Sequence, residues 1–136
     1  MPTHRAEKPL HWVGSSRKDL ITLPADVPDD FGYALGAVQL GATPFQAKPW
    51  RGEDPGVLEL VENHRGDTFR AVYTVRFAKA VSVLHCFQKK SPSGIRTSQS
   101  DIDLIHERLK LAQQHYKEHH GEDYDQGRAS CNGASH

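Results

Sequence analysis

Hydrophobic and polar residues alternate along the middle of the chain in three runs that predict β-strands. The runs span residues 57–63 (VLELVEN), 68–77 and 80–89, and they are rich in the branched and aromatic residues that strands favour. Only the connections HRGD and AK separate them. Since connections this short join antiparallel neighbours, the pattern predicts a meander of hairpins.

A different periodicity, with apolar residues three and four apart, predicts a long helix after the strands. Ser98 and Asp101 have the spacing of a capping box, which marks the beginning of a helix. The apolar face that follows consists of Ile102, Ile105, Leu109, Ala112 and Tyr116. We expect the helix to end near His120, because Gly121 is a typical stop, and we expect residues 121–136 to be a disordered polar tail.

The N-terminal third predicts two short helices that form a helical hairpin. Residues 15–23 begin with hydroxyl side chains that can cap a helix, and Pro24 ends the run. The second helix begins near Pro28 and ends at Gly41. Its apolar face consists of Phe31, Leu35 and Val38.

Together these elements predict one α+β domain with the order β-α-α-β-β-β-α. A short strand at residues 9–13 opens the domain, and residues 42–56 are expected to form a proline-containing loop. Runs of strands and helices that do not alternate indicate helices packed on a small antiparallel sheet. We expect residues 9–120 to form this domain and residues 1–8 to be a flexible N-terminus.

The lengths of the connections also predict which residues face each other. A two-residue turn at Ala78–Lys79 places Val72 opposite His85, and a four-residue loop at His64–Asp67 places Glu59 opposite Val72. Paired residues share a face, and faces alternate along a strand. The face expected to lie on the helices contains Leu58, Leu60, Phe69, Ala71, Tyr73, Val75, Phe77, Leu84 and Cys86. The other face, expected to be open, contains Glu59, Val61, Arg70, Val72, Thr74, Arg76, Val83, His85, Phe87 and Lys89.

Composition places the chain among soluble globular proteins, with 37% hydrophobic and 25% charged residues. No apolar run reaches the ~20 residues that a membrane span needs, and the N-terminus lacks the apolar centre of a signal peptide. The two cysteines, Cys86 and Cys131, do not make a disulfide framework. We therefore expect a cytoplasmic protein that does not bind membranes.

The formal net charge of zero hides an uneven distribution. Residues 48–96 contain nine Lys and Arg but five Asp and Glu, whereas residues 97–136 contain seven acidic and four basic residues. A basic segment of this kind suits a polyanion such as RNA, although it is also compatible with ordinary surface charge.

The face expected to be open carries the groups that metal-independent RNA cleavage requires. In this reaction the 2′-hydroxyl attacks the phosphodiester, so the protein needs a base, an acid and cations that hold the phosphate. Glu59 can serve as the base, His85 as the acid and Arg70 as a bidentate phosphate ligand. Lys89 and Lys90 can hold phosphates at the end of the strand. Further contacts with the RNA backbone can come from Lys48, Arg51, Arg65 and Arg76.

Structural interpretations of the same residues stay open at this point. Glu59 can simply form an ion pair with Arg70, and His85 can be a half-buried strand histidine that is hydrogen-bonded to a neighbour. His115 and His119 have the i, i+4 spacing of a zinc site, but no third ligand follows at a suitable interval. We therefore predict neither a metal site nor a cofactor.

The most specific stretches of the chain are GDTFRAVYTVRF and VLHCFQKKSPSGIRT, flanked by KPLHWVGSSRKDLITLP, FGYALGAVQLG, AKPWRG and DIDLIHERLKLAQQHY. In this order, over residues 8–120, they resemble the RelE/HigB-like toxins of type II toxin–antitoxin systems, above all the phage-derived branch of the RelE/ParE superfamily. The resemblance implies a fold like that of microbial ribonucleases. It also implies cleavage of mRNA, often on the ribosome, and neutralisation by a cognate helix-turn-helix antitoxin.

The resemblance carries over to individual residues only in part. Arg70 in FRAVY matches an arginine that RelE toxins use on the phosphate, and Lys89 and Lys90 match in character the basic residues after the last long strand. The preceding strand of RelE has lysines where this chain has Glu59 and Glu62, and the late catalytic tyrosine of RelE has no clear counterpart. These departures favour a mechanism that uses a histidine, as some HigB-like toxins do.

Two other functions fit the same resemblance. The related ParE-type toxins inhibit a protein target, DNA gyrase, without catalysis, and such an inhibitor would also present a basic surface. A degenerate phage-derived protein that is retained as a binding module would be neither toxic nor paired with an antitoxin gene.

Overall fold

The computed structural model of the chain describes residues 7–50, 56–89 and 98–132, with side chains up to His119. The elements follow in the order β1 (Leu10–Trp12), α1 (Ser16–Ile21), α2 (Val27–Gln39), β2 (Ala47–Pro49), β3 (Val57–His64), β4 (Asp67–Thr74), β5 (Val81–Lys89) and α3 (Gln99–Asn132). The predicted α+β class is confirmed, and so is the order of the helices and the long strands.

The sheet has five strands in the order β1-β5-β4-β3-β2, with β1 parallel to β5 and all other neighbours antiparallel. The edge strand β2 lies in the segment predicted to be a loop, so that part of the prediction is wrong. Two further hydrogen bonds to β3 flank β2 along the chain. Val61 N–H donates to Gln46 O at 3.3 Å before the strand, and Trp50 N–H donates to Val57 O at 3.0 Å after it. Pairing with β3 defines this strand, because three residues are too few to show an alternation of their own.

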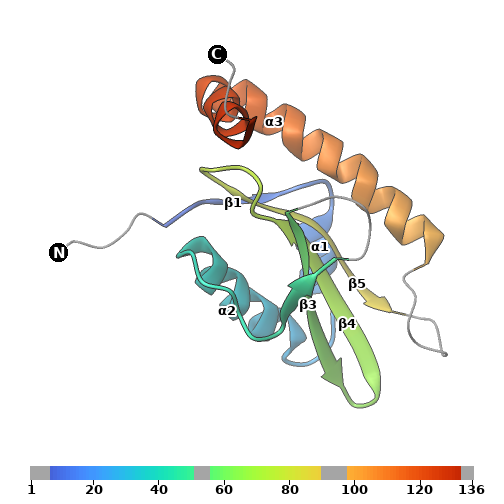
Figure 1. The fold of residues 1–136 in the computed structure, drawn as a ribbon. Helices are drawn as coiled ribbons and strands as arrows, with labels where there is room; N and C mark the ends of the chain where they lie inside the picture. Colours follow the sequence, from blue (N-terminus) through green and yellow to red (C-terminus); the bar gives the residue numbers. More distant parts are fainter. Residues whose placement is uncertain (1–6, 51–55, 90–97, 133–136) are drawn as a thin grey trace.

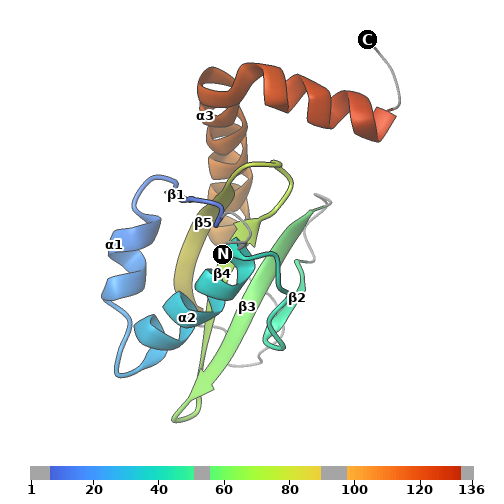
Figure 2. The same cartoon turned by 90° about the vertical axis from the view of Figure 1, so that its left-hand side faces the viewer.

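Helices cover both faces of the sheet and bury one core on each (Figure 1). The first core, under α1 and α2, contains Leu20, Val27, Phe31, Ala34, Leu35, Val38, Leu60, Phe69, Ala71, Tyr73, Val81, Val83 and Cys86. The second core, under α3, contains Val13, Trp50, Val57, Val72, Phe77, Ala80, Leu84, Phe87, Ile105, Leu109, Ala112 and Tyr116. Figure 2 shows α1 and α2 in front of the sheet and the N-terminal half of α3 behind it.

The position of α3 corrects the prediction that the second face of the sheet is open. The apolar residues predicted to line this helix are those that pack in the second core, with Ile102 partly buried beside them. A helix with its own apolar stripe needs a surface to cover, and α1 and α2 already occupy the first face. The charged residues of the second face therefore lie in the same layer as the second core.

A β-bulge between β4 and β5 changes which side chains share a face. Val72 pairs with His85 as predicted, but the next pair is Tyr73 with Val83, so Leu84 is an extra residue in β5. Val83 belongs to the first core and Leu84 to the second, which reverses the faces predicted for both. The prediction failed here because it assumed unbroken alternation along the strand.

The connection between β4 and β5 is longer than the predicted turn at Ala78–Lys79. β4 ends at Thr74 and β5 begins at Val81. Within the connection Phe77 is buried in the second core, whereas Val75 is exposed, so the face predicted for these two residues is wrong as well. Two-residue hairpin turns favour Asn, Asp and Gly, which tolerate positive φ, and Ala-Lys provides none of these.

The helix α3 begins as predicted and continues beyond its predicted end. Ser98 Oγ accepts a hydrogen bond from Asp101 N–H at 3.2 Å, which confirms one of the two bonds of the predicted capping box, and it donates to Asp101 Oδ2 at 2.7 Å. The sequence predicted an end at Gly121, but the backbone stays helical to Asn132 and changes direction on the way (Figure 2). A single glycine costs a helix only about 1 kcal/mol, so it weakens a helix without necessarily ending it.

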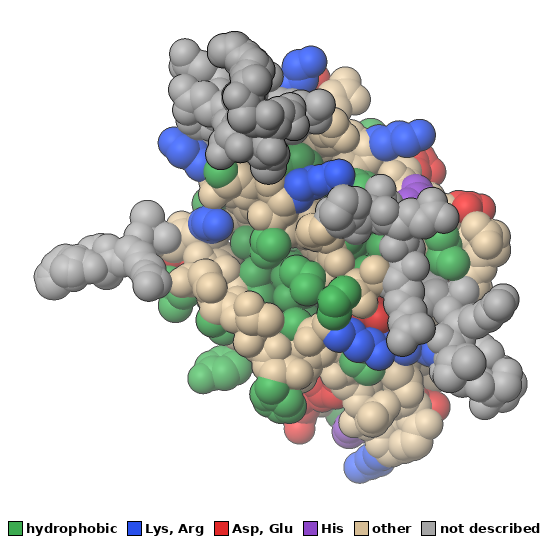
Figure 3. Space-filling model, in the orientation of Figure 1, with side chains coloured by type: hydrophobic (Ala, Val, Ile, Leu, Met, Phe, Trp, Pro, Cys, Tyr) green, Lys and Arg blue, Asp and Glu red, His purple; other side chains and the backbone are tan. Residues whose placement is uncertain are grey.

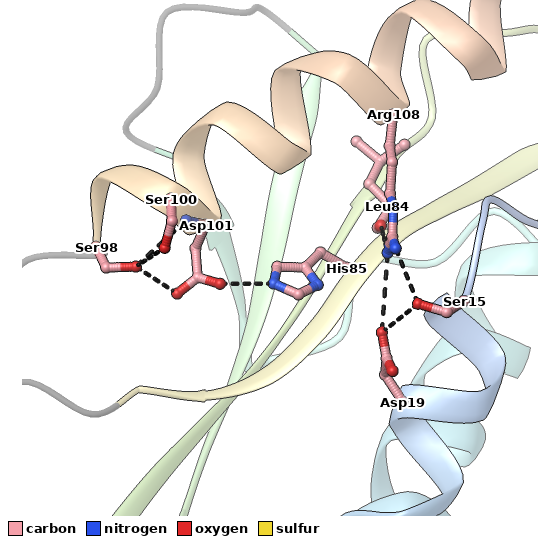
Figure 4. A network of polar contacts seen from close by, with 8 residues as sticks. All are labelled: Ser15, Asp19, Leu84, His85, Ser98, Ser100, Asp101 and Arg108. Atoms are coloured by element: carbon pink, nitrogen blue, oxygen red, sulfur yellow. Dashed lines mark hydrogen bonds and ion pairs between the residues drawn. The ribbon is translucent and has the colours of Figure 1, made fainter.

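Arg108 of α3 ties three elements together beside the bulge (Figure 4). Its Nη1 donates to Leu84 O at 3.0 Å, and its Nη2 donates to Ser15 Oγ at 2.9 Å. Asp19 Oδ2 lies 3.9 Å from Nη1 and adds an opposite charge. Gly14 leaves the necessary room, because a Cβ there would lie 2.8 Å from Arg108 Nε. The network fixes α3 to β5 and α1 around the second core.

Candidate functional site

Charged residues from four strands meet on the face of the sheet that α3 covers. Lys48 of β2 pairs with Glu59, Glu59 pairs with Val72, and Val72 pairs with His85, so these residues form one row across the sheet. The pairing of the last three is as predicted. Because β2 was not predicted, the position of Lys48 beside Glu59 was not predicted either.

Arg70 and Glu59 form a buried ion pair at the centre of this group. Arg70 Nη1 lies 2.6 Å from Glu59 Oε1, and the two residues are 9% and 2% exposed. This is the structural interpretation that the sequence left open for Glu59. Arg70 Nε is also buried, and it has no hydrogen-bond partner among the described residues. The guanidinium therefore keeps a donor that could bind another acceptor.

Lys89 completes the group, and we refer to Lys48, Glu59, Arg70 and Lys89 as the Arg70 cluster. Lys89 is only 8% exposed. Its burial lowers the pKa of its ammonium group, the charges of Arg70 and Lys48 lower this pKa further, and the charge of Glu59 raises it in part. The cluster thus holds three basic side chains against one carboxylate, which is an environment that favours an additional anion.

His85 lies on the same face but is engaged by α3 (Figure 4). Its Nε2 is 2.8 Å from Asp101 Oδ1, and its ring stacks on Phe87 with 4.5 Å between the centroids. The other ring nitrogen, Nδ1, is buried without a hydrogen-bond partner within the described part of the chain. Sequence reasoning treated Asp101 only as a helix cap, and nothing in its spacing indicated a contact with His85.

The remaining predicted contacts do not gather around the Arg70 cluster. Arg65 is exposed in the β3–β4 turn with φ 52°, and Arg76 is exposed in the β4–β5 connection. Figure 3 shows the Lys and Arg side chains of one side of the molecule scattered rather than collected in one patch. Lys90 and Arg51 lie outside the described residues. Of the predicted basic contacts that the structure describes, Lys48 and Lys89 are the ones beside Arg70.

Comparison with known proteins shows to which family the chain belongs. The model of the phage-derived Gp49-like proteins (DUF891) matches residues 18–110, which include the whole Arg70 cluster and Asp101. The chain belongs to this Gp49-like family. No curated protein and no solved structure matches it. This phage-derived family is consistent with the phage-derived branch that the sequence resembles.

The described residues of this Gp49-like protein contain neither a group of side chains placed to hold a metal ion nor a helix that could cross a membrane. No three His, Cys, Asp or Glu side chains among them are placed to hold a metal ion. None of the helices in the described ranges is long and apolar enough to cross a membrane.

Three histidines of the Gp49-like protein stack in a column between β1 and α3. The ring centroids of His11 and His115 are 3.7 Å apart, and those of His115 and His119 are 4.1 Å apart. Burial lowers the pKa of His11 below 6.5, and the two neighbouring imidazoles lower it further. The unfolded chain therefore binds a proton more readily than the folded protein below pH 6.5.

The first prediction follows from this column. We expect the free energy of unfolding to fall as the pH decreases from about 7 to about 5, because protonation of His11 is easier in the unfolded state. His11→Gln should make this loss smaller, by roughly 2–4 °C in Tm at pH 5, and His64→Gln is the matched control. Thermal unfolding followed by circular dichroism measures both. An equal loss in the two variants would show that the column does not resist protonation.

The opposite pH dependence is expected at Glu62 of β3. Burial raises its pKa from 4.5 to about 7, and a hydrogen bond with Asp30 and the charges of Asp30 and Asp26 contribute to the increase. The folded protein therefore holds this proton between pH 4.5 and 7, where the unfolded chain releases it. The stability contributed by the protonated carboxyl is complete below pH 4.5 and is lost as the pH rises through 7.

Glu62→Gln removes this loss, which gives the second prediction. We expect the variant to be more stable than the wild type at pH 8, by roughly 2–4 °C in Tm because the group is partly solvated, and nearly equal to it at pH 4.5. Glu107→Gln, at an exposed position of α3, should show no such trend. A pH-independent difference between Glu62→Gln and the wild type would mean that titration of Glu62 does not cause it.

Proposed function

We propose that this Gp49-like protein is the toxin of a type II toxin–antitoxin system and that it cleaves mRNA without a metal ion. The observation that carries the proposal is the Arg70 cluster, in which three basic side chains surround one carboxylate and Arg70 Nε keeps an unused donor. The family and the resemblance to RelE/HigB-like toxins support the same function. The partners proposed are mRNA, on the ribosome, and a cognate helix-turn-helix antitoxin.

The chemistry proposed for the Arg70 cluster is stabilisation of a phosphodiester that the adjacent 2′-hydroxyl attacks. Negative charge builds up on the phosphate oxygens during this reaction, and fixed cations in a site of low polarity stabilise it strongly. Arg70 Nε, which is buried in the conformation described, donates to one phosphate oxygen once the site opens, and Lys89 supplies a second positive charge. Glu59 holds Arg70 in place through the 2.6 Å contact and is the proposed base for the 2′-hydroxyl proton.

The proposed mechanism assigns His85 a role that depends on Asp101. Proton donation to the leaving 5′-oxygen needs a ring nitrogen within hydrogen-bond reach of that oxygen. In the conformation described, Nε2 is bonded to Asp101 and Nδ1 is buried. The Arg70 cluster therefore carries the electrostatic part of the proposal, and His85 joins only after its contact with Asp101 is broken.

Expression in a bacterium without the antitoxin tests the proposed function. We expect growth to stop, transcripts to acquire new 5′ ends, and the purified protein to cut RNA in the presence of EDTA. The empty vector is the control for growth. Intact transcripts together with DNA damage would instead indicate a ParE-like inhibitor of DNA gyrase, and normal growth would indicate a binding module without toxicity.

A further inference from the structure

The imidazole of His85 cannot contact a ligand in the conformation described. Its Nε2 takes part in the 2.8 Å contact with Asp101 Oδ1, and its Nδ1 is buried. The two side chains differ in solvent exposure: that of His85 is 9% exposed, and that of Asp101 is 29% exposed. A ligand that approaches from the solvent therefore meets the carboxylate of Asp101 before it reaches the ring.

The first turn of α3, which presents Asp101, is packed less closely against the sheet than the middle of the helix. Residues 98–100 are exposed, Asp101 and Ile102 are half-buried, and complete burial begins at Ile105. The hydrogen bonds from Ser98 to Asp101 are local to the turn. Among the described residues, the contact with His85 and the partial packing of Ile102 hold the turn to the second face of the sheet.

The Arg70 cluster lies next to this contact. Arg70 pairs with Phe87, and His85 is two residues before Phe87 on β5, so Arg70 and His85 are diagonal neighbours. Diagonal neighbours on one face of a sheet lie roughly 7–8 Å apart, which a phosphate group and two long side chains can bridge. A phosphate bound by Arg70 would therefore compete with the carboxylate of Asp101 for the same nitrogen of His85.

We propose that the first turn of α3 is a latch that closes the site, with the Asp101 carboxylate in the place of an RNA phosphate. The inference rests on the proposed function, and it names the regulation of that site. RNA displaces Asp101, the turn moves away from the sheet, and His85 Nε2 becomes able to donate a proton. RNA can bind only to molecules in which the latch is open. The apparent affinity is therefore the affinity of the open conformation multiplied by the fraction of molecules that are open.

Asp101→Ala and Asp103→Ala form a matched pair that tests the latch. Both remove one negative charge from the first turns of α3, but Asp103 is exposed and bonds to Gln99 of its own helix. The probe is a 12-nucleotide 2′-O-methyl RNA, which cannot be cut because it has no free 2′-hydroxyl. Its dissociation constant is measured by fluorescence anisotropy, and hydrogen exchange is followed in the peptide of residues 98–105.

We expect Asp101→Ala to bind the RNA roughly tenfold more tightly than the wild type and to exchange faster in its first turn. Asp103→Ala should match the wild type in both measurements. If Asp101→Ala is too unstable to purify, Asp101→Asn replaces it, because the amide keeps an oxygen acceptor and removes the charge.

Unchanged exchange in Asp101→Ala overturns the latch, and so does measurable RNA binding by Asp101→Ala that is no tighter than that of Asp103→Ala. Failure of the proposed function has a different signature. In that case exchange is faster in Asp101→Ala but no variant binds the RNA, so the turn opens without an RNA ligand to displace it.

Discussion

Arg70→Lys is expected to lower the rate of RNA cleavage by roughly 100-fold or more and to abolish growth arrest, while the protein stays folded. Loss of one donor that stabilises transition-state charge costs about 100- to 1,000-fold in rate. Lysine keeps a positive charge beside Glu59 but has neither the planar fork nor the Nε–H that Arg70 presents. Single-turnover cleavage of a defined RNA and growth after induction are the measurements.

Lysine is a better test than alanine at this position because Glu59 is 2% exposed. Alanine would leave a buried carboxylate without its counter-ion, which costs about 3–5 kcal/mol and would mix unfolding with loss of activity. The matched control is Arg17→Lys, the same change at an exposed residue of α1, which should leave cleavage unchanged. If Arg70→Lys cleaves as fast as the control, the Arg70 cluster is not the phosphate site.

Arg108→Met is expected to lower the free energy of unfolding by about 3 kcal/mol, without a direct effect on the groups of the Arg70 cluster. Arg108 is 9% exposed and donates to Leu84 O and Ser15 Oγ. Methionine fills a similar volume but leaves these acceptors without their donor, and unsatisfied buried groups and lost charged hydrogen bonds cost about 1–3 kcal/mol each. Urea denaturation measures the difference, and we expect Tm to fall by roughly 10 °C.

Lys110→Met is the matched control for Arg108→Met. Lys110 is exposed on the same helix, two residues further along, so its replacement removes one positive charge without breaking a buried contact. We expect it to change the free energy of unfolding by no more than about 0.5 kcal/mol. Similar stabilities of the two variants would show that the network around Leu84 O contributes little to the fold.

The pairing that brings the candidate site together could be predicted because it follows from local sequence. Alternation along β3 and β4 and the HRGD connection were sufficient to place Glu59 opposite Val72, as the structure has it. The pairing of Val72 with His85 was also predicted correctly, but it was derived from a two-residue turn at Ala78–Lys79 that the structure does not have. The role of Asp101 could not be predicted in the same way. A capping residue faces the turn that it caps, and whether it also reaches a strand depends on how the helix docks.

The surroundings of the site required the complete fold. The pairing of Lys48 with Glu59 exists only because β2 adds to the edge of β3, a three-residue event that leaves no periodicity in the sequence. Likewise, the bulge at Leu84 places Val83 and Leu84 on faces opposite to those predicted, because one extra residue shifts the alternation along β5. Both features arise from contacts between distant segments, so no local window contains them.

The sequence by itself determined the class of fold, the long strands, the apolar stripe of α3 and the presence of Arg70, Glu59 and His85 on one face. Each of these depends on a repeat of two or of three to four residues, which a chain carries whatever lies around it. Only the tertiary structure decided that α3 covers this face, that Glu59 neutralises part of Arg70, and that Asp101 engages His85. Burial and ion pairing are properties of neighbours in space, and the docking of a helix on a sheet brings those neighbours together.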